Sequence, residues 1–414
     1  MGSTSVLGRL FRALTGPPPN GESRSLRDEL EVSKLTRFVR QRFGDFISEQ
    51  VNPDASARDA ANAPLPRELL REAARLGLTG MSLPRDVGGE GCDLYTWGMV
   101  LEEVAYLCDD LSFPLVISLF AAVASTIYDS GRHDLIERYV RPMARGERFA
   151  SFAFSEERDA FSFLSTAARN GDWYVLNGRK VIVTGGLLAD AFMTYLRAES
   201  GDLAVFLVER DDPGVEVTPV QTMGVRAAGL ASVHLDNVRV PAHRALVGFD
   251  GLAHVQRFLN QRRLLLSCGA VGRMRWAVDA CIQLLSKTGR YRMALTDMQA
   301  VQAKLGRLFV SLETSRIVAH HGLRRLASRA YDPVWDPHLS AAKYYLTEQA
   351  LAVGQTILHL TGGRGYESEY GFERYVRDVT GLISGCGAQD ILEVDLGVWL
   401  VSDREQRQAA EGRK

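Results

Sequence analysis

The chain has 414 residues, of which 46% are hydrophobic and 24% are charged, proportions typical of a globular protein with a large buried core. Its 49 lysines and arginines nearly balance 50 aspartates and glutamates, so it lacks the overall positive field that attracts nucleic acid or an anionic membrane. Five scattered cysteines without a CxxC pair indicate neither a disulfide framework nor a metal site, and they favour a reducing cytoplasm.

The first part of the chain is predicted to be a flexible leader, residues 1–25, followed by a helical domain, residues 26–147. Within this domain DELEVSKLTRFVRQRFGDFI, PRELLREAARLGL and YTWGMVLEEVAYL carry apolar residues three and four positions apart, which is the helical spacing. The most apolar stretch, LSFPLVISLFAAVASTIY, contains a proline and three serines. A membrane span needs about 20 predominantly apolar residues, so this stretch is interpreted as a buried helix.

Residues 148–247 show a different period. WYVLNGRKVIVTG, AFMTYLRA and SVHLDNVRV are short, rich in valine and aromatics, and separated by the turn signals NG, DDPG and DN. They predict an antiparallel β domain. Residues 248–403 return to helical spacing, and residues 404–414 are predicted to be a tail. The predicted fold class is therefore α+β, mostly α, with the β domain in the middle.

Three stretches in a fixed order carry a resemblance to a known family. LREAARLGLTGMSLPRDVGGEGCD leads into LEEVA, VHLDNVRVPAHRALVG closes the β domain, and MQAVQAKL is followed by LTGGRGYESEYGFERYVRD. Together they resemble the acyl-CoA dehydrogenase family from about Leu26 to Leu400. The resemblance implies an N-terminal helical domain, a central β-barrel and a C-terminal four-helix bundle. It also implies FAD bound between the β domain, the bundle and a neighbouring subunit of a homodimer or homotetramer.

The chemistry that the resemblance implies needs a base that the sequence does not supply. In the family a glutamate removes a proton from Cα of an acyl thioester while a hydride leaves Cβ for flavin N5. At the two positions usual for this glutamate the chain has Cys386, in SGCG, and Arg262. A thiol, with an ordinary pKa of about 8.5, is mostly protonated at neutral pH and is a poor base. Cys386 is thus either a catalytic residue or a small filler beside the acyl pocket.

Other charged residues near the expected site leave alternatives open. Arg263 matches an arginine that relatives use near the flavin and the active-site loop, and the alternative is a buried arginine paired with a carboxylate of the bundle. The carboxylates nearest in sequence to the expected flavin face are Glu156, Glu157 and Asp159. Any of the three is a candidate for a relocated base.

Two elements are implied to contact the isoalloxazine ring of FAD. FAFSEERDAFS stands where relatives resemble YxxTEPGAGSD, and it supplies Phe154 and Ser155. The family pattern W-x-[TS] appears as Ile182, Val183 and Thr184, so Thr184 keeps a hydroxyl for flavin N5 although the tryptophan is missing.

The resemblance assigns a second set of residues to the pyrophosphate and adenine of FAD. The family arginine of R-x-x-F-G is replaced by threonine in TGRYR, where the nearby Arg290 is a candidate substitute, and Gln299 is kept. In HLTGG, His359 replaces a glutamine, and Gly362 and Gly363 still let the backbone approach a phosphate. For both Arg290 and His359 a purely structural role is the alternative.

The sequence as a whole predicts a divergent FAD-dependent oxidoreductase that acts on an acyl thioester of CoA or acyl carrier protein, in a biosynthetic pathway. An electron-transfer or reductase partner is expected, and no metal. Two alternatives stay open, because so many family positions are changed together. One is a non-redox or flavin-free pseudoenzyme on the same scaffold, and the other is a monooxygenase that uses reduced flavin and oxygen.

Overall fold

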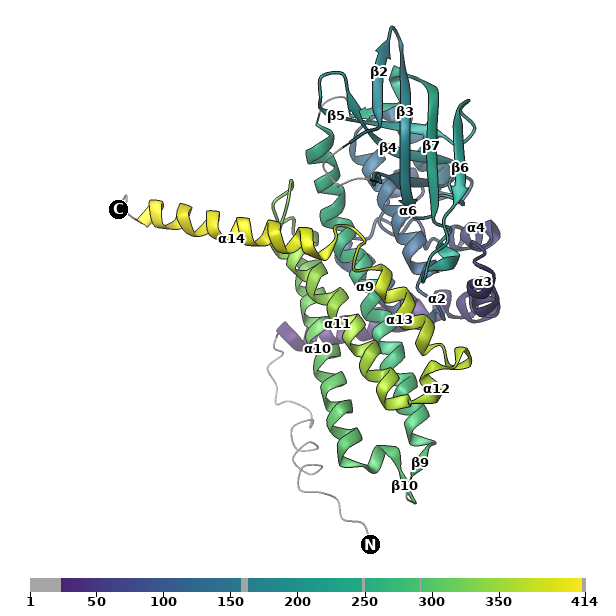
Figure 1. The fold of residues 1–414 in the computed structure, drawn as a ribbon, viewed down its shortest axis with the longest axis vertical. Helices are drawn as coiled ribbons and strands as arrows, with labels where there is room; N and C mark the ends of the chain where they lie inside the picture. The colour runs from purple at the N-terminus through teal and green to yellow at the C-terminus, as the bar shows by residue number, and fades with distance from the viewer. Residues whose placement is uncertain (1–23, 158–162, 248–249, 291, 412–414) are drawn as a thin grey trace.

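The structure is a computed structural model that describes residues 24–157, 163–247, 250–290 and 292–411 (Figure 1). The predicted leader lies outside the described residues except for its last two positions. The N-terminal helices are α2 (Arg24–Phe46), α3 (Ala55–Ala61), α4 (Arg67–Arg75), α5 (Leu94–Leu107), α6 (Ser112–Asp129), α7 (His133–Leu135) and α8 (Arg141–Ala144). The predicted helical domain is thereby confirmed.

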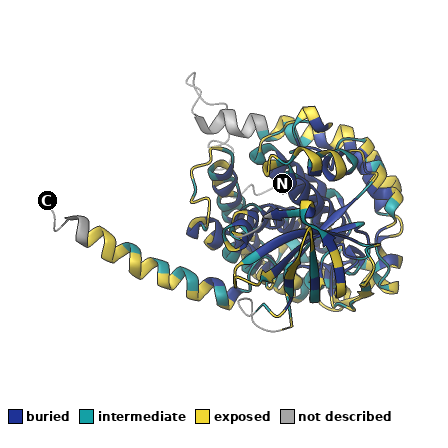
Figure 2. Ribbon diagram, turned by 90° about the horizontal axis from the view of Figure 1, so that it is seen from above, coloured by how far each residue is buried: buried dark blue, intermediate teal, exposed yellow. Residues whose placement is uncertain are grey.

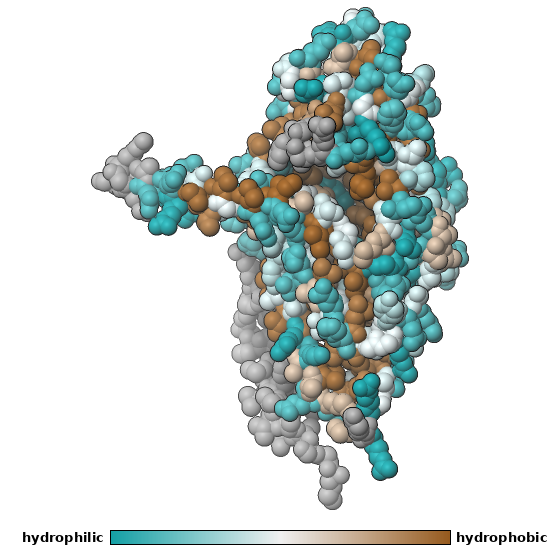
Figure 3. Space-filling model, viewed as in Figure 1, coloured by the Kyte–Doolittle hydropathy of each residue, from teal (hydrophilic) through white to brown (hydrophobic). Residues whose placement is uncertain are grey.

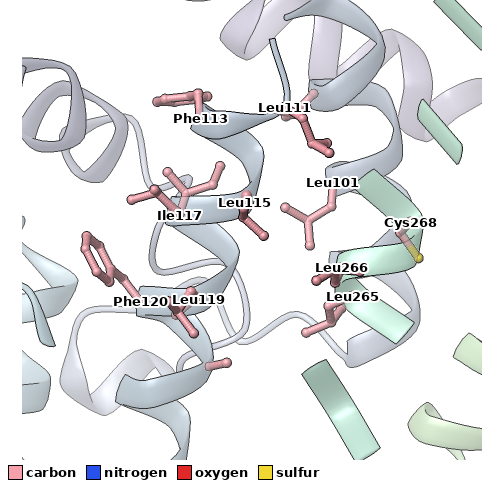
Figure 4. Close-up of a cluster of buried hydrophobic side chains, with 14 of the residues drawn as sticks. Leu101, Leu111, Phe113, Leu115, Ile117, Leu119, Phe120, Leu265, Leu266 and Cys268 are labelled. Carbon is pink, nitrogen blue, oxygen red and sulfur yellow. The ribbon is translucent and has the colours of Figure 1, made fainter. Parts of the chain in front are cut away.

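Helix α6 is the apolar stretch that raised the question of a membrane. It is the one helix among the described residues that is long and apolar enough to cross a bilayer, but 78% of it is buried inside the protein. Its apolar side chains face α9 (Gly251–Ser286) across a shared cluster that includes Leu115 and Leu266 (Figure 4). Burial on nearly all sides explains why the helix is hydrophobic around its whole circumference.

The β domain is one mixed sheet with the strand order β6-β7-β3-β2-β4-β5-β8, and β1 pairs with β4. Its strands are β1 (Ala150–Ala153), β2 (Thr166–Asn170), β3 (Trp173–Val183), β4 (Ala191–Ala198), β5 (Leu203–Glu209), β6 (Val215–Pro219), β7 (Ala231–Pro241) and β8 (Ala245–Val247). Strands β3 and β7 pair antiparallel, with a register shift between Lys180 and Val183. At this bulge Ile182 has a φ of 54°, a left-handed conformation that re-aims the strand just before Thr184.

The C-terminal region is a bundle of α9, α10 (Gln299–Ala327), α11 (Pro337–Thr361) and α13 (Phe372–Gly381). At its end away from the sheet lie the short hairpin of β9 (Gly289–Arg290) and β10 (Met293–Ala294), and α12 (Gly363–Tyr366) (Figure 1). Helix α14 (Gln389–Glu411) leaves the body of the molecule and takes up the described part of the predicted tail (Figure 2). Apolar side chains are exposed along it, including Val394, Val398 and Val401 (Figure 3).

One point of contact joins all three regions. The buried carboxylate of Asp378, on α13, accepts backbone N–H groups of Leu111 (3.2 Å) and Val225 (2.6 Å), which belong to the helical region and to the loop after β6. Its neighbour Arg377 pairs with Asp59 at 2.6 Å. A Cβ on Gly224 would lie 2.2 Å from the carbonyl oxygen of Arg377, so only glycine permits this approach. The proposed borders near residues 147 and 247 therefore separate regions that are firmly attached.

Candidate active site

A cavity of about 590 Å³ lies where the sheet, α6, α9, α13 and the start of α14 meet. Leu115 and Leu119 of α6 and Leu266 of α9 form an apolar part of its wall (Figure 4). Aromatic rings form another part: the centroid of Phe152 lies 4.4 Å from that of Phe258 and 5.7 Å from that of Phe154, with the rings stacked in both pairs. The cavity is thus suited to flat or apolar groups.

The three residues assigned by sequence to the isoalloxazine ring all line this cavity: Phe154, Ser155 and Thr184. The bulge in β3 brings Thr184 to the cavity, where its backbone carbonyl accepts from Ser151. Within the described residues, the hydroxyls of Ser155 and Thr184 have no hydrogen-bond partner in the protein. A stacked aromatic wall beside two open hydroxyls fits a flat heterocycle that carries hydrogen-bonding atoms at its edge, as FAD does.

The loop between α13 and α14 carries Cys386 into the cavity. Cys386 has a φ of 57°, a left-handed conformation that is uncommon for a side-chain-bearing residue. Lys343 of α11 fixes this loop, since its buried Nζ donates to the carbonyl oxygens of Ile383 and Gly387, both at 2.8 Å. Burial lowers the pKa of Lys343 to about 8. The loop is therefore fixed by the bundle.

Two arginines face Cys386. Arg262 lines the cavity together with Cys386, near enough for an electrostatic interaction with the thiol, and Nε of Arg263 donates to the Cys386 carbonyl oxygen at 3.1 Å. Both arginines are buried and both line the cavity. The structure thus brings Cys386 and Arg262, the two positions at which the sequence predicts the family's glutamate, to the wall of one cavity.

Two of the three carboxylates suggested as relocated bases are held in ion pairs. Glu156 lines the cavity, but its Oε1 lies 2.6 Å from Nζ of Lys180, and burial, opposed by Glu156, lowers the pKa of Lys180 to about 8. Glu157 is exposed and pairs with Arg179, and Asp159 lies outside the described residues. A carboxylate that remains is Asp395, which lines the cavity from α14. Sequence reasoning missed it because it lies in the second turn of α14, beyond the loop that carries Cys386.

The residues assigned to the pyrophosphate and adenine do not line the cavity. Arg290 lies in the β9–β10 hairpin and Gln299 starts α10, while His359, Gly362 and Gly363 lie at the end of α11 and the start of α12. The hairpin and α12 are nevertheless in contact, since Nη1 of Arg364 donates to Oγ1 of Thr288 at 3.0 Å. Arg364, which sequence reasoning did not single out, thereby places a positive charge where the family arginine is replaced by threonine. The two sets lie at different ends of the bundle (Figure 1).

The buried histidine that bonds Tyr195, next to the aromatic wall of the cavity, makes folding stability depend on pH. His254 is buried, its Nδ1 lies 2.8 Å from the Tyr195 hydroxyl, and burial, with Arg257, lowers its pKa from 6.5 to about 4. Between pH 6.5 and 4 the unfolded chain binds a proton that the folded protein does not. We expect folding stability to fall by up to about 3 kcal/mol as the pH drops through this window.

Chemical denaturation of the wild type and of His254→Gln at pH 7 and pH 4.5 measures this effect. Glutamine still offers an acceptor to Tyr195 but does not titrate, so the stability difference between the two proteins should shrink or reverse at the lower pH. Parallel losses in both proteins would contradict the assignment.

Comparisons with known proteins agree with this architecture. Models of three acyl-CoA dehydrogenase domains match the chain: the N-terminal domain over residues 33–147, the middle domain over residues 151–238 and the C-terminal domain over residues 250–397. A benzylmalonyl-CoA dehydrogenase of Aromatoleum aromaticum is 31% identical over 376 residues, which cover 88% of this chain and 98% of that protein.

Solved structures show the same fold. A prolyl acyl carrier protein oxidase superposes with a TM-score of 0.83 at 24% identity, covering 89% of this chain and 98% of its own. A glutaryl-CoA dehydrogenase from Mycobacterium smegmatis, in complex with FADH2, gives 0.82 at 24% identity, covering 90% and 95%. By fold the chain is a three-region α+β protein that encloses a cavity between sheet and bundle. It belongs to the acyl-CoA dehydrogenase family, whose members depend on FAD and act on acyl thioesters.

Proposed function

We propose that the protein is an FAD-dependent oxidoreductase that oxidises an acyl thioester of CoA or acyl carrier protein in a biosynthetic pathway. The observation that carries the proposal is that one cavity is lined both by Ser155 and Thr184, the residues expected at the flavin ring, and by Cys386. The loop that carries Cys386 is held in place by Lys343. The apolar walls accommodate an acyl chain. Benzylmalonyl-CoA and prolyl acyl carrier protein, named for two relatives, represent the two kinds of carrier.

In this proposal each group of residues has a separate task. FAD, when bound, accepts the hydride that leaves the acyl chain. Phe154 contributes to the flat wall, Ser155 and Thr184 offer hydrogen bonds to the ring, and the apolar side chains of α6 and α9 exclude water. Cys386 and Arg262 occupy the place beside Cα, where neither provides an ordinary carboxylate base.

Partners and compartment are inferred from other features. We expect an electron-transfer or reductase partner. The separation of Arg290 and His359 from the cavity supports a homodimer or homotetramer in which these residues reach the FAD of a neighbouring subunit. The exposed apolar face of α14 supports the same assembly. Free cysteines at all five positions support a reducing cytoplasm.

A visible spectrum of the purified protein, before and after incubation with FAD, tests the proposal. We expect flavin bands with about one FAD per chain, and bleaching of these bands by an acyl thioester in the absence of oxygen. A colourless protein that binds no FAD would favour the flavin-free scaffold. Bound flavin that is bleached only by a reductase and then consumes oxygen would favour the monooxygenase.

Thr184→Val sharpens this test. The substitution keeps the shape of the side chain and removes the hydroxyl, so flavin reduction should slow by about tenfold to a hundredfold if Thr184 bonds the ring, since hydrogen bonds to charged groups contribute about 1.5–3 kcal/mol. Thr356→Val is the matched control, because its hydroxyl donates to Ala352 on α11 outside the cavity. Equal reduction rates in the wild type and Thr184→Val would contradict the role of Thr184.

A further inference from the structure

The charges of Arg262 and Arg263 are not balanced by the protein. They are 2% and 3% exposed, and burial lowers the pKa of both. Their hydrogen-bond partners are uncharged: Ser118 Oγ at 2.8 Å for Arg262, and the Cys386 carbonyl, Asn260 Oδ1 and Gln256 Oε1 at 3.1, 3.5 and 3.5 Å for Arg263. Within the described parts of the chain no carboxylate lies within 4.0 Å of either guanidinium. Two adjacent buried cations in this state are costly unless an anion joins them.

Other charged residues of the cavity are already paired. Arg377 is bound by Asp59 and Glu373, and Glu156 by Lys180. Asp395 raises the pKa of Arg263 from a greater distance. When these ion pairs are set aside, the described charged residues that line the cavity are Arg262, Arg263 and Asp395. Their charges sum to one excess positive charge. This excess matches a ligand group with a single negative charge.

The place of the excess charge indicates which part of a ligand carries the anion. Arg262 donates to Ser118 Oγ of α6 at 2.8 Å and interacts electrostatically with Cys386, and it lines the same cavity as the apolar side chains of Leu115, Leu119 and Leu266. The cavity is otherwise apolar there, so it suits an acyl chain better than the phosphates of a carrier. Both positions that would approach Cα of a thioester, Cys386 and Arg262, meet at this point.

We propose that Arg262 and Arg263 bind a carboxylate carried by the acyl group on or next to Cα, so that the preferred substrate is a carboxylated acyl thioester. The inference rests on the proposed function, because it takes the ligand to be an acyl thioester. A planar guanidinium donates to both oxygens of a carboxylate, and the second arginine beside it can add a further hydrogen bond. A neutral acyl group of the same length leaves the excess positive charge of this pair buried without a counterion.

Binding of two matched ligands tests this inference. Pantetheine is the part that CoA and acyl carrier protein share, and the hexylmalonyl and octanoyl thioesters of pantetheine differ by one carboxylate on Cα. Isothermal titration calorimetry of the FAD-saturated protein should show at least about tenfold tighter binding of the hexylmalonyl thioester, since charge-assisted hydrogen bonds contribute about 1.5–3 kcal/mol. Equal affinities would overturn the carboxylate site and leave the proposed function intact. Failure of both thioesters to bind would overturn the proposed function as well.

Variants locate the effect. Arg262→Gln should remove most of the preference for the hexylmalonyl thioester over the octanoyl thioester, while Arg262→Lys, which keeps the charge, should retain part of the preference. Arg145→Gln, at an exposed arginine away from the cavity, is the control. Melting curves of each variant establish folding. An unchanged preference in folded Arg262→Gln would overturn the assignment of Arg262, and the comparison of ligands in the wild type does not depend on any variant.

Discussion

Replacement of Lys180 by methionine should lower the free energy of unfolding by about 3–5 kcal/mol, the usual cost of removing one partner from a buried ion pair. Lys180 and Glu156 are 0% and 4% exposed, so the substitution leaves a buried carboxylate without its cation. Glu156 also accepts the backbone N–H of Leu164 at 2.6 Å, so its carboxylate contributes a second interaction. Urea denaturation followed by circular dichroism measures the effect.

The neighbouring residue provides the control for this prediction. Arg179 pairs with Glu157 at the same 2.6 Å distance, but these side chains are 54% and 63% exposed. Arg179→Met should therefore cost less than about 1 kcal/mol, because solvent screens an exposed pair. Replacing Lys180 and Glu156 together by Met and Gln should recover part of the loss. Similar losses for Lys180→Met and Arg179→Met would contradict the importance of burial.

Replacement of Cys386 by glutamate should abolish the preference for a carboxylated thioester, a change of about tenfold or more in relative affinity. The new carboxylate would be placed beside Arg262 and would neutralise it, so a carboxylate on the ligand would meet a like charge instead of a free cation. The same pairing should hold the new side chain ionised. Calorimetry with the hexylmalonyl and octanoyl thioesters measures the ratio of affinities.

Cys386→Gln is the matched variant for this experiment. It has the same size and imposes the same strain at a φ of 57°, but it carries no charge, so the preference should persist. If Cys386→Glu kept the wild-type preference and oxidised the octanoyl thioester, the cavity would hold its anion elsewhere, and the arginines would serve another purpose. If Cys386→Glu lost the preference for the carboxylated thioester and oxidised the octanoyl thioester, the new glutamate would both neutralise Arg262 and act as the base.

The order of the three regions could be predicted because each keeps one period of apolar residues over many positions. The helical spacing in residues 26–147, the alternation in WYVLNGRKVIV and the helical spacing from residue 251 are local properties of the chain. Cys386, Arg262 and Thr184 could be assigned to one site through motifs whose order the family shares, and the structure does bring these three to one cavity.

Pairings across distant elements could not be predicted in this way. The alternating pattern of β3 does not reveal that the bulge after Lys180 accompanies a buried lysine, or that its partner is Glu156 from another segment. The same holds for Asp395, because the direction of α14 depends on a loop that Lys343 fixes from α11. That no carboxylate of the described residues lies within 4.0 Å of Arg262 is likewise visible only when the neighbouring elements are in place.

The junction at Asp378 has a consequence for exchanging parts among relatives. One carboxylate accepts N–H groups from the helical region and from the β domain, and a glycine at position 224 is needed for the backbones to meet. A chimera that takes its bundle from another member inherits an aspartate that must find both amides at the same spacing. We therefore expect a chimera to fold well only if Leu111, Gly224 and Asp378 are taken from the same parent, although they lie in three different segments of the chain.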